Sequence, residues 1–273
     1  MEWFDKAPLW LIGVVLTLVL VAAEELGVRA RRVASRSRGT VAGDADNGVS
    51  SLVGAALGLL ALIFGFTYAM AQERYDQRRA LVMAEARAVV TSYLRYQALD
   101  EPDSSQLDRL MGEYTALRSQ AIDPQVDRAS LQALVARTEQ MQSQIWALVV
   151  HGLGRKPELI EPVMESTNEM FEVAATRRAI VDARIPSSIQ MGLVLFAVFT
   201  SFFTGYGLAL DRRHRFATAA LFLLFTFVYI LVIDLDRSYS GPIRVSQGPM
   251  VQAADRIARL EAAKKAPATD DRP

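Results

Sequence analysis

Residues Ser51 to Arg79, SLVGAALGLLALIFGFTYAMAQERYDQRR, decide the fold of this chain. From Ser51 to Ala71 the stretch carries no formal charge, and about 20 apolar residues are enough for a helix to cross a hydrocarbon core of roughly 30 Å. Charged residues then follow from Glu73 to Arg79 with no Gly or Pro to stop the helix. The sequence therefore predicts one helix that crosses a bilayer and continues into a water-facing domain.

Composition limits the class of protein and the chemistry that it supports. The 273 residues are 51% hydrophobic, the mean hydropathy is +0.17, and the apolar residues are grouped in uncharged runs, as in a multi-span membrane protein. A net charge of zero gives no reason to expect nucleic acid as a partner. There is no Cys, and His151 and His214 do not occur in a metal-binding spacing, so we predict no metal site and no cofactor.

The predicted fold class is all-α, with four transmembrane helices and a helical soluble domain between the second and third spans. In chain order we predict a first span in 1–28, an Arg-rich loop in 29–49, a second span in 50–72, the soluble domain in 73–188, a third span in 189–210, a basic loop in 211–215, a fourth span in 216–235, and a C-terminal turn, short helix and tail in 236–273. A cleaved signal peptide is the alternative for the first span. However, Glu2 and Asp5 precede it, where a signal peptide carries positive charge.

Helical periodicity extends through the soluble domain. Helices are predicted over 74–99, 104–121, 123–150 and 157–183, with Ser104 or Ser105 as one N-cap and Asp123-Pro124 as another start. In the first of these helices, one set of residues recurs at intervals of three and four and so defines one face: Leu81, Ala84, Glu85, Ala88, Val89, Ser92 and Tyr93. No alternating strand pattern occurs in the domain.

Arginines mark two loops beside the predicted spans. They are Arg29, Arg31, Arg32, Arg36 and Arg38 in the first loop, and Arg212, Arg213 and Arg215 in the second. Positive charge in short loops is retained on the cytoplasmic side of a membrane. With four spans both loops fall on that side, so we predict that the helical domain and the C-terminus are extracytoplasmic. A lipid-headgroup site is the alternative reading of the first loop.

Two segments of the chain resemble the bestrophin channels. The first is Gly65-Phe66 with the run from Glu73 to Arg79, and the second is the Asp234 to Met250 segment with its Gly-Pro pairs and the helix that follows. The runs GFTYAMAQERYDQRRALVMAEARAV and IDLDRSYSGPIRV are more similar still to a bacterial bestrophin-like group, the DUF4239 proteins. The resemblance covers most of the chain from Ser51 to Ala263.

This resemblance implies a homo-oligomeric, pentameric ion channel in the bacterial inner membrane, with lipid, further copies of itself and inorganic ions as partners. The second span of each subunit would line a hydrophobic neck. The family's neck positions correspond to Gly58, Leu62 and Phe66, of which Gly58 departs from the bulky apolar pattern. Residues four apart share a helix face, so the spacing itself is consistent with a common lining. The alternative is that Leu62 and Phe66 pack between helices or subunits.

Charged residues after the neck have two readings. Glu73, Arg74, Asp76 and Arg78 are candidate charge rings if the helix lines a pore, and otherwise form a collar of ion pairs one turn apart. Their mixed signs leave the sign of the permeant ion open. Animal bestrophins use an acidic cluster to bind calcium.

Near the place that corresponds to the acidic calcium cluster of animal bestrophins, this chain has only Asp234 and Asp236. Two carboxylates supply too few oxygens for calcium, so we assign no metal. The family also places its helical domain and both termini in the cytoplasm, opposite to the arginine prediction.

An ion channel is the first functional hypothesis. The second is a non-conducting, membrane-anchored helical scaffold or sensor that binds a partner through its soluble domain. An enzyme is not expected, because the sequence has no nucleophile–base arrangement, no phosphate-binding Gly loop and no paired catalytic carboxylates.

Overall fold

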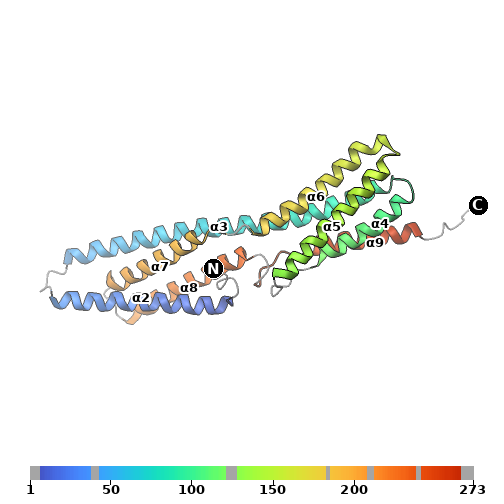
Figure 1. Cartoon of the computed structure of the whole chain (residues 1–273). Helices are drawn as coiled ribbons and strands as arrows, with labels where there is room; N and C mark the ends of the chain where they lie inside the picture. Colours follow the sequence, from blue (N-terminus) through green and yellow to red (C-terminus); the bar gives the residue numbers. More distant parts are fainter. Residues whose placement is uncertain are drawn as a thin grey trace, which may run out of the picture. The chain divides into compact units, whose positions relative to one another are not determined.

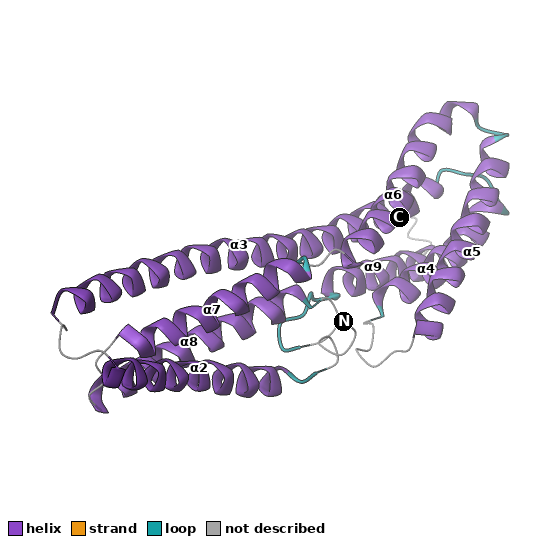
Figure 2. Ribbon diagram, turned by 60° about the vertical axis from the view of Figure 1, so that its left-hand side comes forward, coloured by secondary structure: helices purple, strands orange, loops and turns teal. Residues whose placement is uncertain are grey.

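The computed structural model describes residues 7–37, 43–120, 128–182, 185–207, 212–237 and 241–265. Its elements are α2 (Leu9–Ser37), α3 (Gly43–Tyr96), α4 (Asp103–Ser119), α5 (Arg128–Leu153), the 3-10 helix η1 (Pro157–Leu159), α6 (Ile160–Asp182), α7 (Ser187–Gly207), α8 (Arg212–Asp236) and α9 (Gly248–Lys265). Helices provide all the regular structure in these residues (Figure 2), which confirms the all-α prediction.

The chain divides into two compact units. Unit 1 consists of Met1–Tyr75 and Arg184–Ile243, and unit 2 of Asp76–Ala183 and Arg244–Pro273, so α3 contributes residues to both. Four helices are long and apolar enough to cross a membrane: Leu9–Ala34, Ser51–Tyr96, Ser187–Gly207 and Phe216–Asp236. The prediction of four spans is therefore confirmed.

In unit 1, α2, α7, α8 and the first part of α3 lie side by side (Figure 1) around a core that includes Leu20, Phe64 and Phe222. The tightest contact joins α2 to α7. A Cβ added to Gly27 would lie 2.0 Å from the Phe202 carbonyl oxygen, and one added to Gly205 would lie 2.1 Å from the Glu24 carbonyl oxygen. Small residues that let helix backbones touch are typical of packing inside membranes.

Hydrogen bonds join α2 to both α7 and α8. Ser201 Oγ donates to the Leu20 carbonyl at 2.6 Å, and Thr17 and Thr226 join α2 to α8 through their hydroxyls at 3.2 Å. Because lipid offers these groups no water, each finds its partner on a neighbouring helix.

Unit 2 packs α4, α5, α6, α9 and the second part of α3 around a separate core. Among its fully buried residues are three tyrosines, Tyr93, Tyr96 and Tyr114, and burial raises the pKa of the Tyr114 phenol. Glu85 is also completely buried. Its carboxylate accepts hydrogen bonds from Arg118 Nε at 2.6 Å and Arg177 Nη1 at 2.6 Å, which ties α3 to α4 and α6.

Helix ends differ from the sequence-based boundaries. α2 continues to Ser37 and α3 already begins at Gly43, so most of the segment predicted as an Arg-rich loop is helical. The reason is local: no Pro interrupts residues 29–37, and Arg is a good helix former. α4 begins at Asp103, not at Ser104 or Ser105 as a capped start, and Pro102 makes no capping hydrogen bond. The predicted Asp123-Pro124 start lies outside the described residues.

Candidate pore-lining helix

The first part of α3 has one buried face and one exposed face within the subunit. Leu60, Phe64 and Ala71 are buried, and Phe64 packs on Phe225 of α8 with ring centroids 4.9 Å apart. Leu62 is 54% exposed and Phe66 is 66% exposed. The two residues are four apart, so they lie one above the other on the exposed face.

Gly58 lies on the same exposed face, one turn before Leu62. A Cβ added at this position would meet no atom within 4 Å. The glycine is therefore not required by packing inside the subunit. The structure thus brings the three predicted neck residues together on one surface of one helix.

Most of the apolar stretch of α3 is not buried within the subunit. Only 22% of its most apolar stretch is buried within the subunit, against 44% for the equivalent stretch of α2. Burying apolar surface stabilises by about 25 cal/mol per Å². Lipid or further protein therefore has to cover this helix.

The charged residues that follow are not equivalent. In unit 1, Glu73 is exposed and Arg74 is half-buried. In unit 2, Asp76 is exposed, whereas Arg78 is only 5% exposed. Arg78 therefore does not share an accessible surface with Asp76.

The basic segments have structural roles that the sequence did not indicate. Arg31 Nη1 donates to the carbonyl oxygens of Tyr206 at 3.2 Å and Gly207 at 2.8 Å, which caps the C-terminal end of α7. Arg29 is exposed and pairs with Glu25 at 3.6 Å.

Arg32 and Arg36 are exposed on α2, Arg212, Arg213 and Arg215 belong to the first turn of α8, and Arg38 lies outside the described residues.

Asp234 and Asp236 bind backbone and side-chain donors. Asp236 accepts hydrogen bonds from the Ile185 amide at 2.9 Å and from Gln190 Nε2 at 3.3 Å, and Asp234 accepts one from the Ile243 amide at 3.1 Å. Arg237 donates to the Ala7 carbonyl at 2.8 Å. These bonds fasten the ends of α7 and α8 and the start of α2. Among the described residues, no group of three or more His, Asp or Glu side chains is placed to hold a metal.

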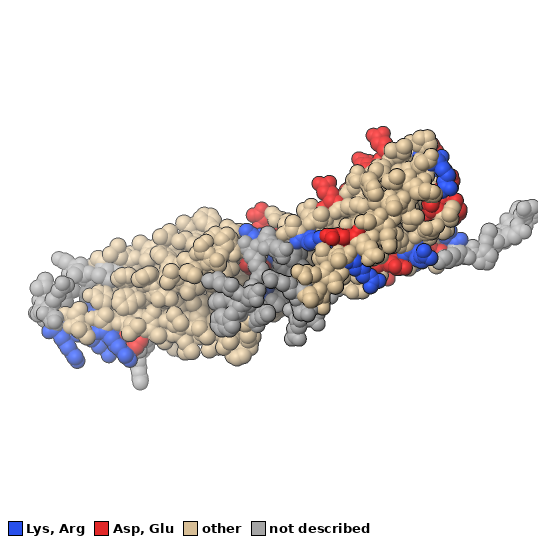
Figure 3. Space-filling view, in the orientation of Figure 1, with Lys and Arg blue, Asp and Glu red and all other residues tan. Residues whose placement is uncertain are grey.

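Charge is distributed in a simple way over the surface (Figure 3). The tan, uncharged surface covers the spans of unit 1, while blue and red side chains gather on unit 2 and at the basic ends of the unit 1 helices. This is the pattern of a bilayer-embedded unit and a water-facing unit.

The fold defines a class, a helical membrane protein with four spans and a helical bundle inserted between the second and third. A profile of the Bestrophin-like domain matches residues 10–250. The chain belongs to the bestrophin-like family. The resemblance seen in the sequence is thereby confirmed.

Solved structures show the same fold. A bacterial bestrophin homologue from Klebsiella pneumoniae superposes with a TM-score of 0.65 at 13% identity, over 93% of this chain and 99% of that chain. A point variant of a Klebsiella pneumoniae bestrophin homologue gives a TM-score of 0.69 at 10% identity, over 92% and 98% of the two chains. A further structure described as a membrane protein gives 0.65 at 12% identity, over 92% and 98%. No curated protein sequence matches the chain.

Proposed function

We propose that this protein is a subunit of a homo-oligomeric, pentameric ion channel, and not an enzyme. One observation carries the proposal: Leu62 and Phe66 are large apolar side chains that the subunit leaves exposed on one face of α3. Membership of the bestrophin-like family supports the same reading. In a ring of subunits this face lines a shared conduit, and unit 2 extends it.

Phe66 forms the narrowest part of the neck in this proposal, with Leu62 one turn away. A constriction of apolar side chains blocks ions because water leaves it readily, and an ion cannot pass without its hydration shell. Gly58 contributes backbone and no side chain, so the conduit widens there. Of the four candidate ring charges after the neck, Glu73 and Asp76 are exposed and Arg74 is partly accessible.

The orientation follows from the arginines. Those at the end of α2 and the start of α8 retain these ends on the cytoplasmic side of a bacterial inner membrane. Unit 2 and the C-terminus then lie outside the cytoplasm.

Ion flux through liposomes tests the channel. Purified protein should pass inorganic ions, and Phe66→Ala should raise the flux severalfold because it removes the ring that dewets the neck. Phe199→Ala is the matched control, since Phe199 of α7 is 61% exposed but lies outside the proposed conduit. Its flux should equal that of the unchanged protein.

Subunit number is the second measurement, made by native mass spectrometry of the protein in detergent. A ring of five is expected. Stable monomers or dimers, together with silence of both the original protein and Phe66→Ala, would favour the non-conducting scaffold instead.

A further inference from the structure

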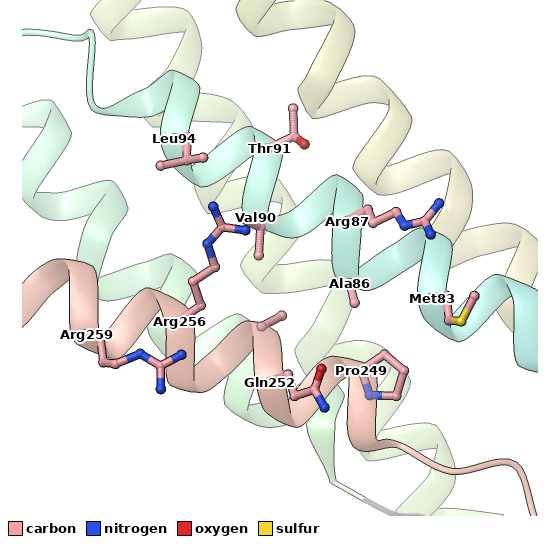
Figure 4. A pocket seen from close by; sticks show the side chains of 11 residues that line it. Met83, Ala86, Arg87, Val90, Thr91, Leu94, Pro249, Gln252, Arg256 and Arg259 are labelled. Atoms are coloured by element: carbon pink, nitrogen blue, oxygen red, sulfur yellow. The ribbon is translucent and has the colours of Figure 1, made fainter.

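A groove of about 760 Å³ lies between α3 and α9 in unit 2 (Figure 4). Apolar side chains form part of its wall, including Val90 and Leu94 of α3. Three arginines also line it: Arg87 from α3, and Arg256 and Arg259 from α9. Figure 4 shows Arg256 reaching from α9 toward Val90 and Leu94.

These three arginines are exposed and make no ion pair with any described residue. The acidic residues nearest to them in sequence, Glu85, Asp255 and Glu261, do not line the groove. The groove is therefore an apolar surface with concentrated positive charge, and an acidic surface is its natural complement.

Such a surface exists on α6 of the same unit. Its glutamates recur at intervals of four, four and three, so they form one stripe along the helix, and all are exposed: Glu161, Glu165, Glu169 and Glu172. Acidic side chains gather along this edge of unit 2 in Figure 3. Only Glu165 has an ion partner in the described part of the chain, Arg95 at 3.6 Å. Like charges four residues apart destabilise a helix, so this stripe is costly without a cationic partner.

The groove and the stripe lie on opposite flanks of α3. On one flank, Ala86 and Val90 face α9 across the groove. On the other flank, Ser92 donates a hydrogen bond to the Ser166 carbonyl of α6 at 2.9 Å, and Arg95 donates one to the Pro162 carbonyl. Ala86 and Arg95 are nine residues apart, about half a turn out of phase at 3.6 residues per turn. Arg87 and Leu94 lie on the exposed face between these flanks.

We infer that the α3/α9 groove is a docking surface for a second copy of this chain, which inserts its α6 glutamate stripe between the three arginines. The inference rests on the proposed channel, in which α3 faces the central axis. In such a ring the two flanks of α3 meet those of the neighbouring subunits. A contact between different surfaces on opposite flanks is head-to-tail, and head-to-tail contacts form a ring when the rotation from copy to copy closes.

Charge reversal in the full-length protein tests the contact. Arg256→Glu with Arg259→Glu should lower the ratio of ring to monomer at least about tenfold in native mass spectra. Adding Glu169→Arg and Glu172→Arg to that variant should restore the ring. Arg109→Glu with Arg137→Glu is the matched control, since both are exposed arginines of unit 2 outside the groove and should leave the ring intact.

Cross-linking covers the case in which the reversed variant does not fold. The chain has no cysteine, so Arg256→Cys combined with Glu169→Cys introduces the only two thiols. A short bis-maleimide should join them into a ladder of covalent oligomers, whereas either single variant should stay monomeric because its thiol faces no thiol across the proposed contact.

The outcomes separate the two proposals. A ring that survives the arginine reversal, with no ladder, overturns the docking surface and leaves the channel standing; an anionic lipid or another protein would then be the occupant of the groove. An unchanged protein that forms no ring overturns both.

Discussion

At the scale of single residues, the buried carboxylates of Glu85 and Asp236 are matched to specific donors. Glu85 has no exposure and is held by Arg118 and Arg177. An isolated buried carboxylate would be strongly destabilising, whereas one with two guanidinium partners is tolerated because its lone pairs are satisfied. Asp236 is also satisfied, because its carboxylate accepts a hydrogen bond from the Ile185 amide. These acids therefore fix the ends and crossings of helices.

Gly241 is the residue where backbone and side-chain constraints coincide. Its φ is +112°, a conformation that L residues rarely adopt, and an added Cβ would lie 1.8 Å from Asp234 Oδ1. Gly241→Ala should therefore lower the free energy of unfolding by about 1–3 kcal/mol, measured as a lower midpoint of thermal unfolding in detergent. Gly248→Ala is the control, because that position has ordinary φ and its nearest neighbour is a serine side chain at 3.2 Å. Equal midpoints for the two variants would contradict the role of the turn.

At the scale of elements, α2 and α7 form one rigid pair. Their backbones touch at Gly27 and Gly205, and Ser201 bonds across the contact. Lipid tails are as apolar as the side chains, so close van der Waals packing, and not hydrophobic burial, holds such helices together.

Two glycines on α7 allow a matched test of this pair. Gly205→Ala should destabilise by about 1–3 kcal/mol, since its Cβ meets the Glu24 backbone and neither helix can yield without moving. Gly192→Ala should be neutral or slightly stabilising, because nothing lies within 4 Å of its Cβ and Ala favours a helix. Thermal unfolding of the two variants in one detergent makes the comparison. A neutral Gly205→Ala would show that α2 and α7 are not in backbone contact.

The sequence predicted elements better than contacts. Periodicity identified the face of α3 that carries Glu85, Val89, Ser92 and Tyr93, and all four are buried. It could not identify Arg118 and Arg177 as the partners of Glu85, because they come from helices 33 and 92 residues away. It also missed the Gly205 contact, since a glycine in an apolar run has no distinguishing neighbours. The neck positions Gly58, Leu62 and Phe66 came from the family resemblance, and spacing predicted only that they share one face of a helix, which is exposed in α3.

At the scale of the whole molecule, the arginines and the family resemblance imply opposite orientations. The arginine rule applies to charges near the ends of spans, and Arg31 is also needed to cap α7. A structural role of this kind explains one arginine of the set without reference to the membrane. Topology is therefore an independent property to be measured.

A reporter fused after Pro273 measures it. Alkaline phosphatase should be active there, because it folds only outside the cytoplasm, and green fluorescent protein should be dark when exported unfolded. Fusions in the segment between α2 and α3 should give the reverse result. Fluorescence at the C-terminus with silent phosphatase would assign unit 2 to the cytoplasm and show that the arginine rule does not hold for this protein.

The backbone contact between α2 and α7 limits how such a channel could change its bore. At Gly27 and Gly205 the main chains of α2 and α7 touch with no side chains between them, so we expect these two helices to move together. By contrast, α3 meets α8 through side chains, with Phe64 on Phe225, so in the proposed channel we expect a change in bore to come from movement at this contact.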